Sequence, residues 1–374
     1  MAYMLHGGDI YHKKITYDFS VNVNPLGIPP GVQQILRDSV GHWDSYPDPE
    51  CRQLRRKLAG HHGVEEERIA CGNGAADLIY RLAFGIRPRK ALLPSPTFSE
   101  YGRALSAVGC QVRHYGLREE ENFRVDVGEL ARFLEEGDIL FLCNPNNPTG
   151  QAVPNRQVAQ LLQACRDKQV FCVLDECFCE FLDRPDTYTF MGNIRDWPEA
   201  VILRAFTKSY ALAGLRLGYA VCGDPGVAGK LRQTGQPWSV SLPAQEAGVA
   251  ALEEKDYLEQ VRSLLRRERE YVGDGLTKLG FCVFPSQANY LLFKDVEEDS
   301  HGNLWEQLRE KGILIRDCSN FAGLGSSGSG LPGKDPAFRY YRTAIRTREE
   351  NEKLLDAVRM AVQGKNEKER NPVI

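Results

Sequence analysis

Hydrophobic and polar positions in the middle of the chain predict two buried strands joined by a helix. Residues 139–143 (ILFLC) form an unbroken apolar run of the length of a buried strand, and a polar, proline-rich stretch follows it. Over 158–165, apolar residues recur at helical spacing, and 170–174 (VFCVL) forms a second apolar run. This pattern is typical of a βαβ unit, in which the two strands lie parallel in one sheet.

Shorter apolar runs continue the pattern on both sides of this unit. They lie at 91–94, 200–204 and 219–222, so the stretch from 50 to 225 alternates strands with helical segments. We therefore predict an α/β fold with a mainly parallel central sheet between helices. In such sheets, ligands bind beyond the carboxyl ends of the strands.

A smaller α+β domain is predicted after residue 250, where the pattern changes. A long charged segment, 251–279, carries one apolar stripe, made of Leu258, Val261, Leu264, Leu265 and Val272. Beyond it we expect strands at 282–285, 290–293, 313–316 and 340–346, and helices at 303–311 and 349–362. The glycine- and serine-rich stretch 323–336 predicts a mobile excursion, and the polar tail from 364 predicts a frayed end.

Composition and charge narrow the classes of function. Of the 374 residues, 42% are hydrophobic and 26% are charged, which is typical of a globular protein. The 47 basic residues nearly cancel the 50 acidic ones, so the net charge of -3 favours neither nucleic acid nor an anionic membrane surface. No run of about 18 apolar residues occurs, and the N-terminus lacks the pattern of a signal peptide, so we expect a cytoplasmic protein.

The eleven cysteines are an odd number and often lie within apolar runs, which predicts reduced core thiols rather than a disulfide framework. Because no CxxC or HExxH motif occurs, we predict no metal site. The stretch 177–180 (CFCE) invites a redox or metal hypothesis, but packing explains alternating apolar cysteines more simply.

Four polar residues follow the predicted strands. Asn147 comes after the first strand of the βαβ unit, and Asp175 directly follows the second. Lys208 lies just past the next apolar run, with Arg216 eight residues further on. An isolated acid or lysine at a strand end is normally a cap or a solvated charge. Four such residues at one edge of one sheet indicate a shared site instead.

Pyridoxal phosphate chemistry requires such a set. A lysine amine forms a Schiff base, a carboxylate keeps the pyridine nitrogen protonated, and polar donors hold the ring oxygen and the phosphate. The stretch 72–77 (GNGAAD) precedes an apolar helix whose free amides and dipole suit a phosphate. A glycine turn before a helix would explain this stretch alone, so the hypothesis rests on the combination.

Several motifs resemble those of a known family over nearly the whole chain. NPNNPTG, DECF and TKSYALAGLRLGY are similar to motifs of fold-type I pyridoxal-phosphate enzymes of the histidinol-phosphate aminotransferase group. A narrower resemblance, to the threonine-phosphate decarboxylases of cobalamin biosynthesis, rests on HGGD, DFSVNVNPLG, YPDP, EYGRAL, QPWSV, ILIRDCSNFAGL and YYRTAIR. The resemblance implies a homodimer with shared active sites that acts on a small phosphorylated amino acid.

The same resemblance implies how the chain divides into domains. Residues 1–40 would form an N-terminal arm and part of the small domain. Residues 41–250 would form the large pyridoxal-phosphate-binding domain, and residues 251–374 the small C-terminal domain with its frayed tail.

The resemblance also implies roles for individual residues. Lys208 would be the Schiff-base lysine, and Asp175 would be the catalytic partner of the pyridine nitrogen. The cofactor-binding residues would be Ala75, Ala76, Phe98, Asn147, Asp175, Thr207, Lys208 and Arg216, joined by Tyr46 from the neighbouring subunit. Arg342 would bind the substrate carboxylate, and the substrate phosphate would meet Arg316, Asn22, His6 and Gly7. Simpler alternatives remain: Phe98 as a core residue, Tyr46 as a surface turn residue and His6 as a terminal side chain.

The implied reaction converts L-threonine O-3-phosphate to (R)-1-amino-2-propanol O-2-phosphate. The alternative is transamination, as in histidinol-phosphate aminotransferase. The two reactions differ in which bond at the α-carbon stands perpendicular to the conjugated plane, which the sequence does not show. A non-catalytic vitamin-binding protein of the same fold is disfavoured because Lys208 and Asp175 are both present.

One departure from the group favours decarboxylation. Many aminotransferases of the group have a tyrosine three residues after the ring-nitrogen aspartate, whereas this chain has Phe178. The decarboxylase-like subgroup shares this phenylalanine.

Overall fold

The computed structural model describes residues 7–11, 13–295, 303–324 and 339–370, with side chains through residue 363. The predicted excursion at 323–336 therefore lies almost entirely outside the described residues, and so does His6. Within the described residues, no helix is long and apolar enough to cross a membrane.

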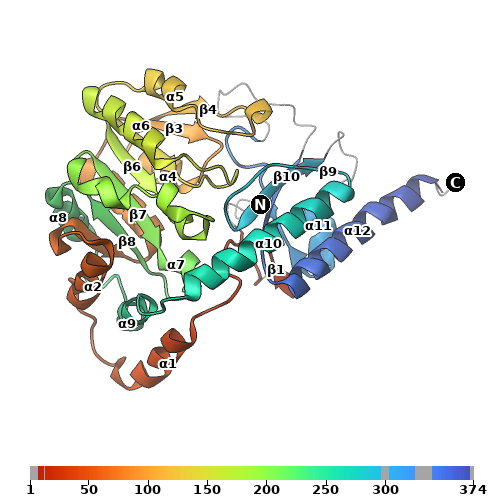
Figure 1. Ribbon diagram of the computed structural model, residues 1–374, viewed down its shortest axis with the longest axis horizontal. Helices are drawn as coiled ribbons and strands as arrows, with labels where there is room; N and C mark the ends of the chain where they lie inside the picture. The colour runs from red at the N-terminus through yellow and green to blue at the C-terminus, as the bar shows by residue number, and fades with distance from the viewer. Residues whose placement is uncertain (1–6, 12, 296–302, 325–338, 371–374) are drawn as a thin grey trace.

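A seven-stranded sheet forms the centre of the larger part of the molecule (Figure 1). Its strands are β2 Ile69–Gly72, β3 Lys90–Ser95, β4 Gln111–Gly116, β5 Asp138–Cys143, β6 Phe171–Asp175, β7 Ala200–Ala205 and β8 Gly218–Cys222. Their order is β2-β8-β7-β6-β5-β3-β4, and the five strands from β7 to β4 are parallel. The predicted α/β fold with a mainly parallel sheet is confirmed.

The two edge strands, β2 and β4, were not predicted from the sequence, for different reasons. β2 has only four residues, and β4 carries polar residues along most of its length. β8, which was predicted, runs antiparallel to β7 and to β2. The connection from β7 to β8 contains only the single-turn helix α7 Phe206–Ser209, which is too short to carry the chain back along the sheet for a parallel crossover.

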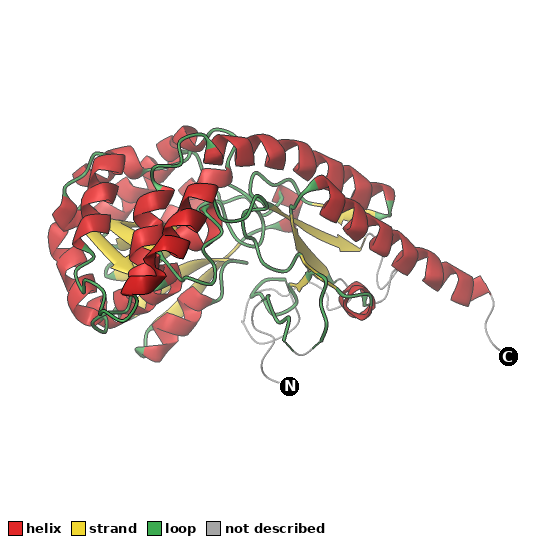
Figure 2. Ribbon diagram, turned by 90° about the horizontal axis from the view of Figure 1, so that it is seen from below, coloured by secondary structure: helices red, strands yellow, loops and turns green. Residues whose placement is uncertain are grey.

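Helices cover both faces of this sheet (Figure 2). They are α2 Arg52–His62, α3 Gly74–Ile86, α4 Glu100–Ala107, α5 Val127–Phe133, α6 Asn155–Asp167, α8 Pro225–Thr234 and α9 Leu242–Ala251. The buried residues of α6 are the ones at helical spacing in the sequence, namely Val158, Leu161, Leu162 and Cys165. Short 3-10 helices are η1 Val40–His42, η2 Glu66–Arg68, η3 Glu119–Glu121, η4 Cys179–Phe181, η5 Pro185–Thr187 and η6 Met191–Asp196.

All eleven cysteines are described and free, and ten of them are buried.

A second, antiparallel sheet forms the smaller part of the molecule. Its order is β12-β13-β10-β9, and its strands are β9 Phe281–Val283, β10 Tyr290–Asp295, β12 Arg316–Asp317 and β13 Tyr340–Ala344. The long helix α10 Tyr257–Lys278 runs from the larger part to this sheet (Figure 1), which is accompanied by α11 Leu304–Glu310 and α12 Arg348–Arg370. α12 is longer than the predicted 349–362, because no proline interrupts the chain before residue 372.

The N-terminal segment is built into this smaller part. Strand β1 Tyr17–Asp18 pairs in parallel with β11 Ile313–Leu314. The Phe19 amide then donates to the Leu314 carbonyl (2.7 Å), and the Ala344 amide donates to the Phe19 carbonyl (2.8 Å). The segment is thus hydrogen-bonded on both sides, whereas α1 Pro30–Ser39 packs against α9 of the larger part.

Candidate active site

Twelve of the fourteen residues predicted for the site line one cavity of about 370 Å³. They are Gly7, Asn22, Ala75, Ala76, Phe98, Asn147, Asp175, Thr207, Lys208, Arg216, Arg316 and Arg342. Asn147, Asp175 and Lys208 lie at the carboxyl ends of β5, β6 and β7, which are adjacent parallel strands. The cavity therefore lies where ligands bind in sheets of this class.

The other two predicted residues are not in this cavity. Tyr46 is 80% exposed, and the centre of its ring lies 4.7 Å from that of the Trp238 ring, with the two rings tilted by 33°. It does not line the cavity of its own chain. His6 lies outside the described residues.

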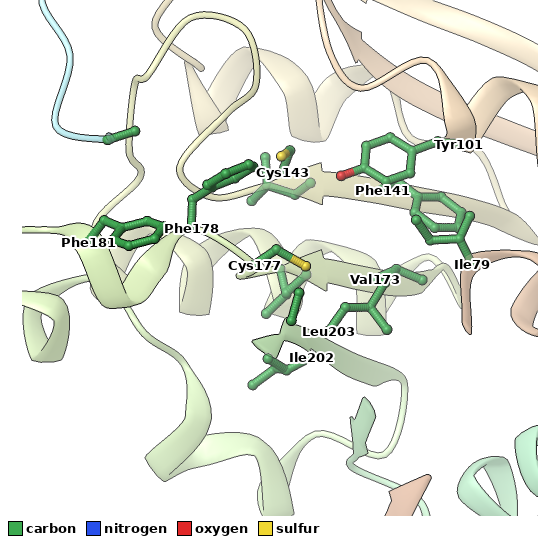
Figure 3. Packing of buried hydrophobic residues seen from close by; sticks show 14 of the residues in the cluster. Ile79, Tyr101, Phe141, Cys143, Val173, Cys177, Phe178, Phe181, Ile202 and Leu203 are labelled. Carbon is green, nitrogen blue, oxygen red and sulfur yellow. The ribbon is translucent and has the colours of Figure 1, made fainter. Parts of the chain in front are cut away.

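Asp175 is a buried carboxylate held by two neutral donors. Its Oδ2 accepts from the Tyr101 hydroxyl (2.6 Å), and its Oδ1 accepts from the Cys177 amide (3.0 Å). Within the described part of the chain, no lysine or arginine forms an ion pair with it. Tyr101 is itself fully buried and stacked on Phe141, with its hydroxyl directed toward the strand ends (Figure 3). Burial, followed by the charge of Asp175, raises the pKa of Tyr101, so its proton stays in place.

The Lys208 amine faces the same cavity. Its Nζ lies 5.8 Å from the centre of the Phe178 ring. Burial lowers its pKa from 10.5 to about 8, and the positive charges of Arg342 and Arg216 contribute to the shift. A larger fraction of the amine is therefore neutral, and thus nucleophilic, near neutral pH than for an exposed lysine.

One end of the cavity forms an anion cradle. Ala75 and Ala76 lie in the first turn of α3, and Thr207 and Arg216 line the cavity beside them. Gly74 has a φ of +80°, and a Cβ there would come within 2.6 Å of Arg216 Nη2. The glycine therefore lets the guanidinium approach the start of the helix, where free amides and the helix dipole favour an anion.

Two buried arginines on neighbouring strands of the smaller sheet also line the cavity. Arg316 of β12 and Arg342 of β13 are directly paired in register. Arg342 donates to Asn147 Oδ1 and, through Nη2, to the Ser20 carbonyl (2.7 Å), while Arg316 donates to Asn320 Oδ1 (2.7 Å). Burial lowers the pKa of both arginines.

Two buried polar atoms of the cavity lining have no hydrogen-bond partner among the described residues. They are Asn22 Oδ1 and Arg342 Nε. Leaving a buried polar group unpaired costs about 1–3 kcal/mol. Both atoms therefore indicate a polar ligand on this side of the cavity.

The sequence analysis missed three features that support the site. Tyr101 lies three residues after Phe98 in the EYGRAL motif, but nothing in the sequence showed that it reaches Asp175. Ser20 lies in the DFSVNVNPLG motif and meets Arg342 only through its carbonyl oxygen. Such long-range contacts have no periodic signal in the sequence.

The third feature is a buried ion-pair network on the far side of the strand ends. Arg204 of β7 contacts Glu176 (2.8 Å) and also pairs with Glu180. Glu176 accepts in addition from the Thr189 hydroxyl (2.7 Å). Asp175 lines the cavity whereas its neighbour Glu176 does not. The network therefore stabilises the ends of β6 and β7 on the side that faces away from the cavity.

Comparison with known proteins identifies the family of the chain. The family model for aminotransferase class I and II matches residues 14–358. The chain belongs to the aminotransferase class I and II family. It is 38% identical to the threonine-phosphate decarboxylase of Salmonella typhimurium, over 93% of this chain and 91% of that protein.

Solved structures of related enzymes resemble more than nine-tenths of the chain. The L-threonine-O-3-phosphate decarboxylase of Porphyromonas gingivalis matches with a TM-score of 0.79 and 25% identity, over 92% of this chain and 99% of that one. The histidinol-phosphate aminotransferase of Sinorhizobium meliloti, solved in complex with pyridoxal-5'-phosphate, matches with a TM-score of 0.82 and 25% identity. The match covers 94% of this chain and 92% of that one.

The residues present fit pyridoxal phosphate. The Gly74 cradle at α3 suits its phosphate, and the buried carboxylate of Asp175, held only by neutral donors, suits a protonated ring nitrogen. Lys208 supplies an amine of lowered pKa between them.

We expect the reactivity of Lys208 in the cofactor-free protein to rise with pH around a midpoint near 8, because its pKa is lowered to about 8. The amine is protonated and inert below this pH and neutral above it. Competitive labelling with acetic anhydride, quantified by mass spectrometry, measures the midpoint. The exposed Lys13 serves as the control. An identical profile for both lysines would contradict the assigned environment.

We expect Tyr101→Phe to lower the free energy of unfolding of the cofactor-free protein by about 1–3 kcal/mol, because it leaves a buried carboxylate oxygen without its donor. Tyr115→Phe is the matched control. Its hydroxyl donates to Glu129 (2.7 Å), a carboxylate that water reaches, so we expect a loss below about 1 kcal/mol. Urea denaturation measures both values, and equal losses would refute the special role of Tyr101.

Proposed function

We propose that this protein is a pyridoxal-phosphate-dependent decarboxylase of L-threonine O-3-phosphate, which releases carbon dioxide and (R)-1-amino-2-propanol O-2-phosphate. The observation that carries the proposal is the pair of buried arginines on β12 and β13, Arg316 and Arg342. Together with the cradle at Arg216, the cavity offers three cationic positions. They match the cofactor phosphate, the substrate carboxylate and the substrate phosphate.

In this proposal Arg342 binds the substrate carboxylate. Its guanidinium is fixed by Asn147 and by the Ser20 carbonyl, while its Nε is left free of partners among the described residues. A fixed guanidinium with a free N–H can hold a carboxylate in one orientation.

Arg316, Asn22 and Gly7 would meet the substrate phosphate. Arg316 and Gly7 line both this cavity and the smaller one beside it, and Asn22 lines the larger cavity with a side-chain amide whose Nδ2 can donate to a phosphate oxygen. The backbone amide of a glycine and a guanidinium are both good phosphate donors.

Bound pyridoxal phosphate supplies a conjugated ring that accepts the electron pair of the bond broken at the substrate's α-carbon. The residues of the chain decide which bond that is. With the carboxylate held by Arg342 and the phosphate by Arg316, rotation about the amine–Cα bond is restricted, because both ends of the substrate are fixed. Lys208 Nζ faces the cavity and can hold the proton that replaces carbon dioxide at the α-carbon.

Transamination remains the second candidate. The same Lys208 could remove the α-hydrogen instead, and structurally similar proteins include the aminotransferase of Sinorhizobium meliloti. Phe178, which lines the cavity beside Asp175, offers no hydroxyl to the ring oxygen. This feature supports the decarboxylase.

We further propose a symmetric homodimer in which Tyr46 completes the partner's cofactor site. Large apolar side chains are exposed along one stretch of the chain, namely Ile35, Val40, Trp43 and Tyr46, and Trp238 joins them. Exposed aromatic residues of this density mark an interface rather than a free surface. A self-complementary contact between two copies would cover them.

The proposed reaction predicts that holoenzyme and L-threonine O-3-phosphate release carbon dioxide without amino transfer to a keto acid. Arg316→Ala is expected to raise KM for the phosphate ester about a hundredfold, because charge-assisted contacts are lost. The same variant should leave the affinity for L-threonine unchanged, whereas Arg342→Ala should weaken both ligands. Separate assays of carbon dioxide and of amino transfer decide the outcome. Transamination of histidinol phosphate without carbon dioxide release would establish the alternative.

The dimer proposal predicts that Tyr46→Phe weakens binding of pyridoxal phosphate about tenfold to a hundredfold without changing the molecular mass in solution. Losing one hydrogen bond to a charged phosphate costs about 1.5–3 kcal/mol. Equilibrium dialysis and light scattering make the two measurements. A monomeric wild-type protein with full cofactor affinity would refute the proposal.

A further inference from the structure

The N-terminal segment meets the active-site cavity at Gly7 and Ser20. Both residues, together with Arg316, line the active-site cavity and also a neighbouring cavity of about 130 Å³. The wall between the two cavities is therefore built from the N-terminal segment on one side and from β12 on the other.

The Ser20 side chain fixes this part of the segment. Its hydroxyl donates to Asp18 Oδ1 (2.6 Å) and accepts from the Gly8 amide (2.7 Å). The Ser20 amide donates to the same Asp18 oxygen (2.8 Å). Because the single hydroxyl proton is used by Asp18, the lone pairs of Oγ are free to face Gly8.

The contact requires both glycines. A Cβ at position 7 would collide with the carbonyl oxygen and the hydroxyl of Ser20. Gly8 has a φ of +88°, which other residues rarely adopt. Gly7 and Gly8, here called the glycine strap, can therefore lie directly on Ser20.

The backbone of Ser20 makes a second connection. Its carbonyl oxygen accepts from Arg342 Nη2 (2.7 Å), and the residue is 1% exposed. The preceding residue, Phe19, is hydrogen-bonded to Leu314 on one side and to Ala344 on the other. Ser20 is thus fixed in place and touches both the strap and the arginine proposed for the carboxylate.

We propose that Ser20 is a positioning residue that sets the preference for a phosphorylated substrate. This inference rests on the proposed function. The hydrogen-bond chain Asp18–Ser20–Gly8 holds the glycine strap against the cavity beside Arg316, where it closes the phosphate end. A ligand without a phosphate makes no use of the strap, but it still uses Arg342, which Ser20 supports through its carbonyl.

The test is Ser20→Ala in the holoenzyme. This variant removes the hydroxyl but keeps the carbonyl that supports Arg342. We expect KM for L-threonine O-3-phosphate to rise about tenfold, the effect of one lost hydrogen bond, with kcat changed less than about threefold. Affinity for L-threonine, measured as competitive inhibition, should stay the same. Ser263→Ala, at an exposed position of α10 that lines neither cavity, should change none of these values.

Variants at Asp18 test the chain at its other end. Asp18→Ala removes the acceptor and should reproduce the Ser20→Ala phenotype. Asp18→Asn keeps an oxygen acceptor and should restore most of the preference for the phosphate ester. Loss of affinity for both ligands alike in Ser20→Ala, or equal effects of the two Asp18 variants, would overturn the inference.

Hydrogen exchange gives a measurement that does not depend on activity. The Gly8 amide should exchange faster in Ser20→Ala than in the wild type, because it loses its acceptor. Unchanged protection, together with an unchanged substrate preference, would also overturn the inference. Failure of the proposed function would be seen in a different measurement. The wild-type enzyme would then release no carbon dioxide, regardless of the effect of Ser20→Ala on phosphate preference and on exchange of the Gly8 amide.

Discussion

The structure of the site depends on one buried negative charge. Asp175 lies at the end of β6 with two neutral donors, Tyr101 and the Cys177 amide. Removing a carboxylate from water without a cationic partner is costly, so the fold supplies donors from two elements to hold it. A protonated ring nitrogen would supply the missing cation. A cofactor bound as proposed would therefore complete the electrostatics of the protein as well as its chemistry.

Positively charged side chains line the same cavity as Asp175. Arg216 and Arg342 approach from different elements, and both lower the pKa of Lys208. Burial is the largest cause of the lowered pKa of Lys208, and the arginines proposed to bind the anionic ends of cofactor and substrate add to it. These arginines would thus serve anion binding and the nucleophilicity of the lysine together.

The central strands and the large-sheet residues of the site could be predicted because their signals are local. Asn147, Asp175 and Lys208 follow apolar runs that parallel pairing brings to one edge. The placement of Arg316 beside Arg342 could be expected only through resemblance, since the register of β12 and β13 joins segments with no local signal. The contacts of Tyr101 and Ser20 were missed for the same reason, as they connect residues 74 and 322 positions away.

In the proposed function, the choice of reaction comes from the smaller part of the molecule. The groups suited to pyridoxal phosphate lie on the large sheet. Decarboxylases and aminotransferases of this fold can share this arrangement, because both reactions need the cofactor ring as an electron sink. Arg316, Arg342 and Ser20 stand instead on the segment and strands of the small sheet. A small displacement of that unit would rotate the bound substrate and change which α-carbon bond is perpendicular to the ring. The hydrogen bonds that hold Phe19 between β11 and β13 limit such displacement. If Arg316 and Arg342 bind the substrate as proposed, the N-terminal segment would therefore contribute to reaction specificity without touching the reacting atoms.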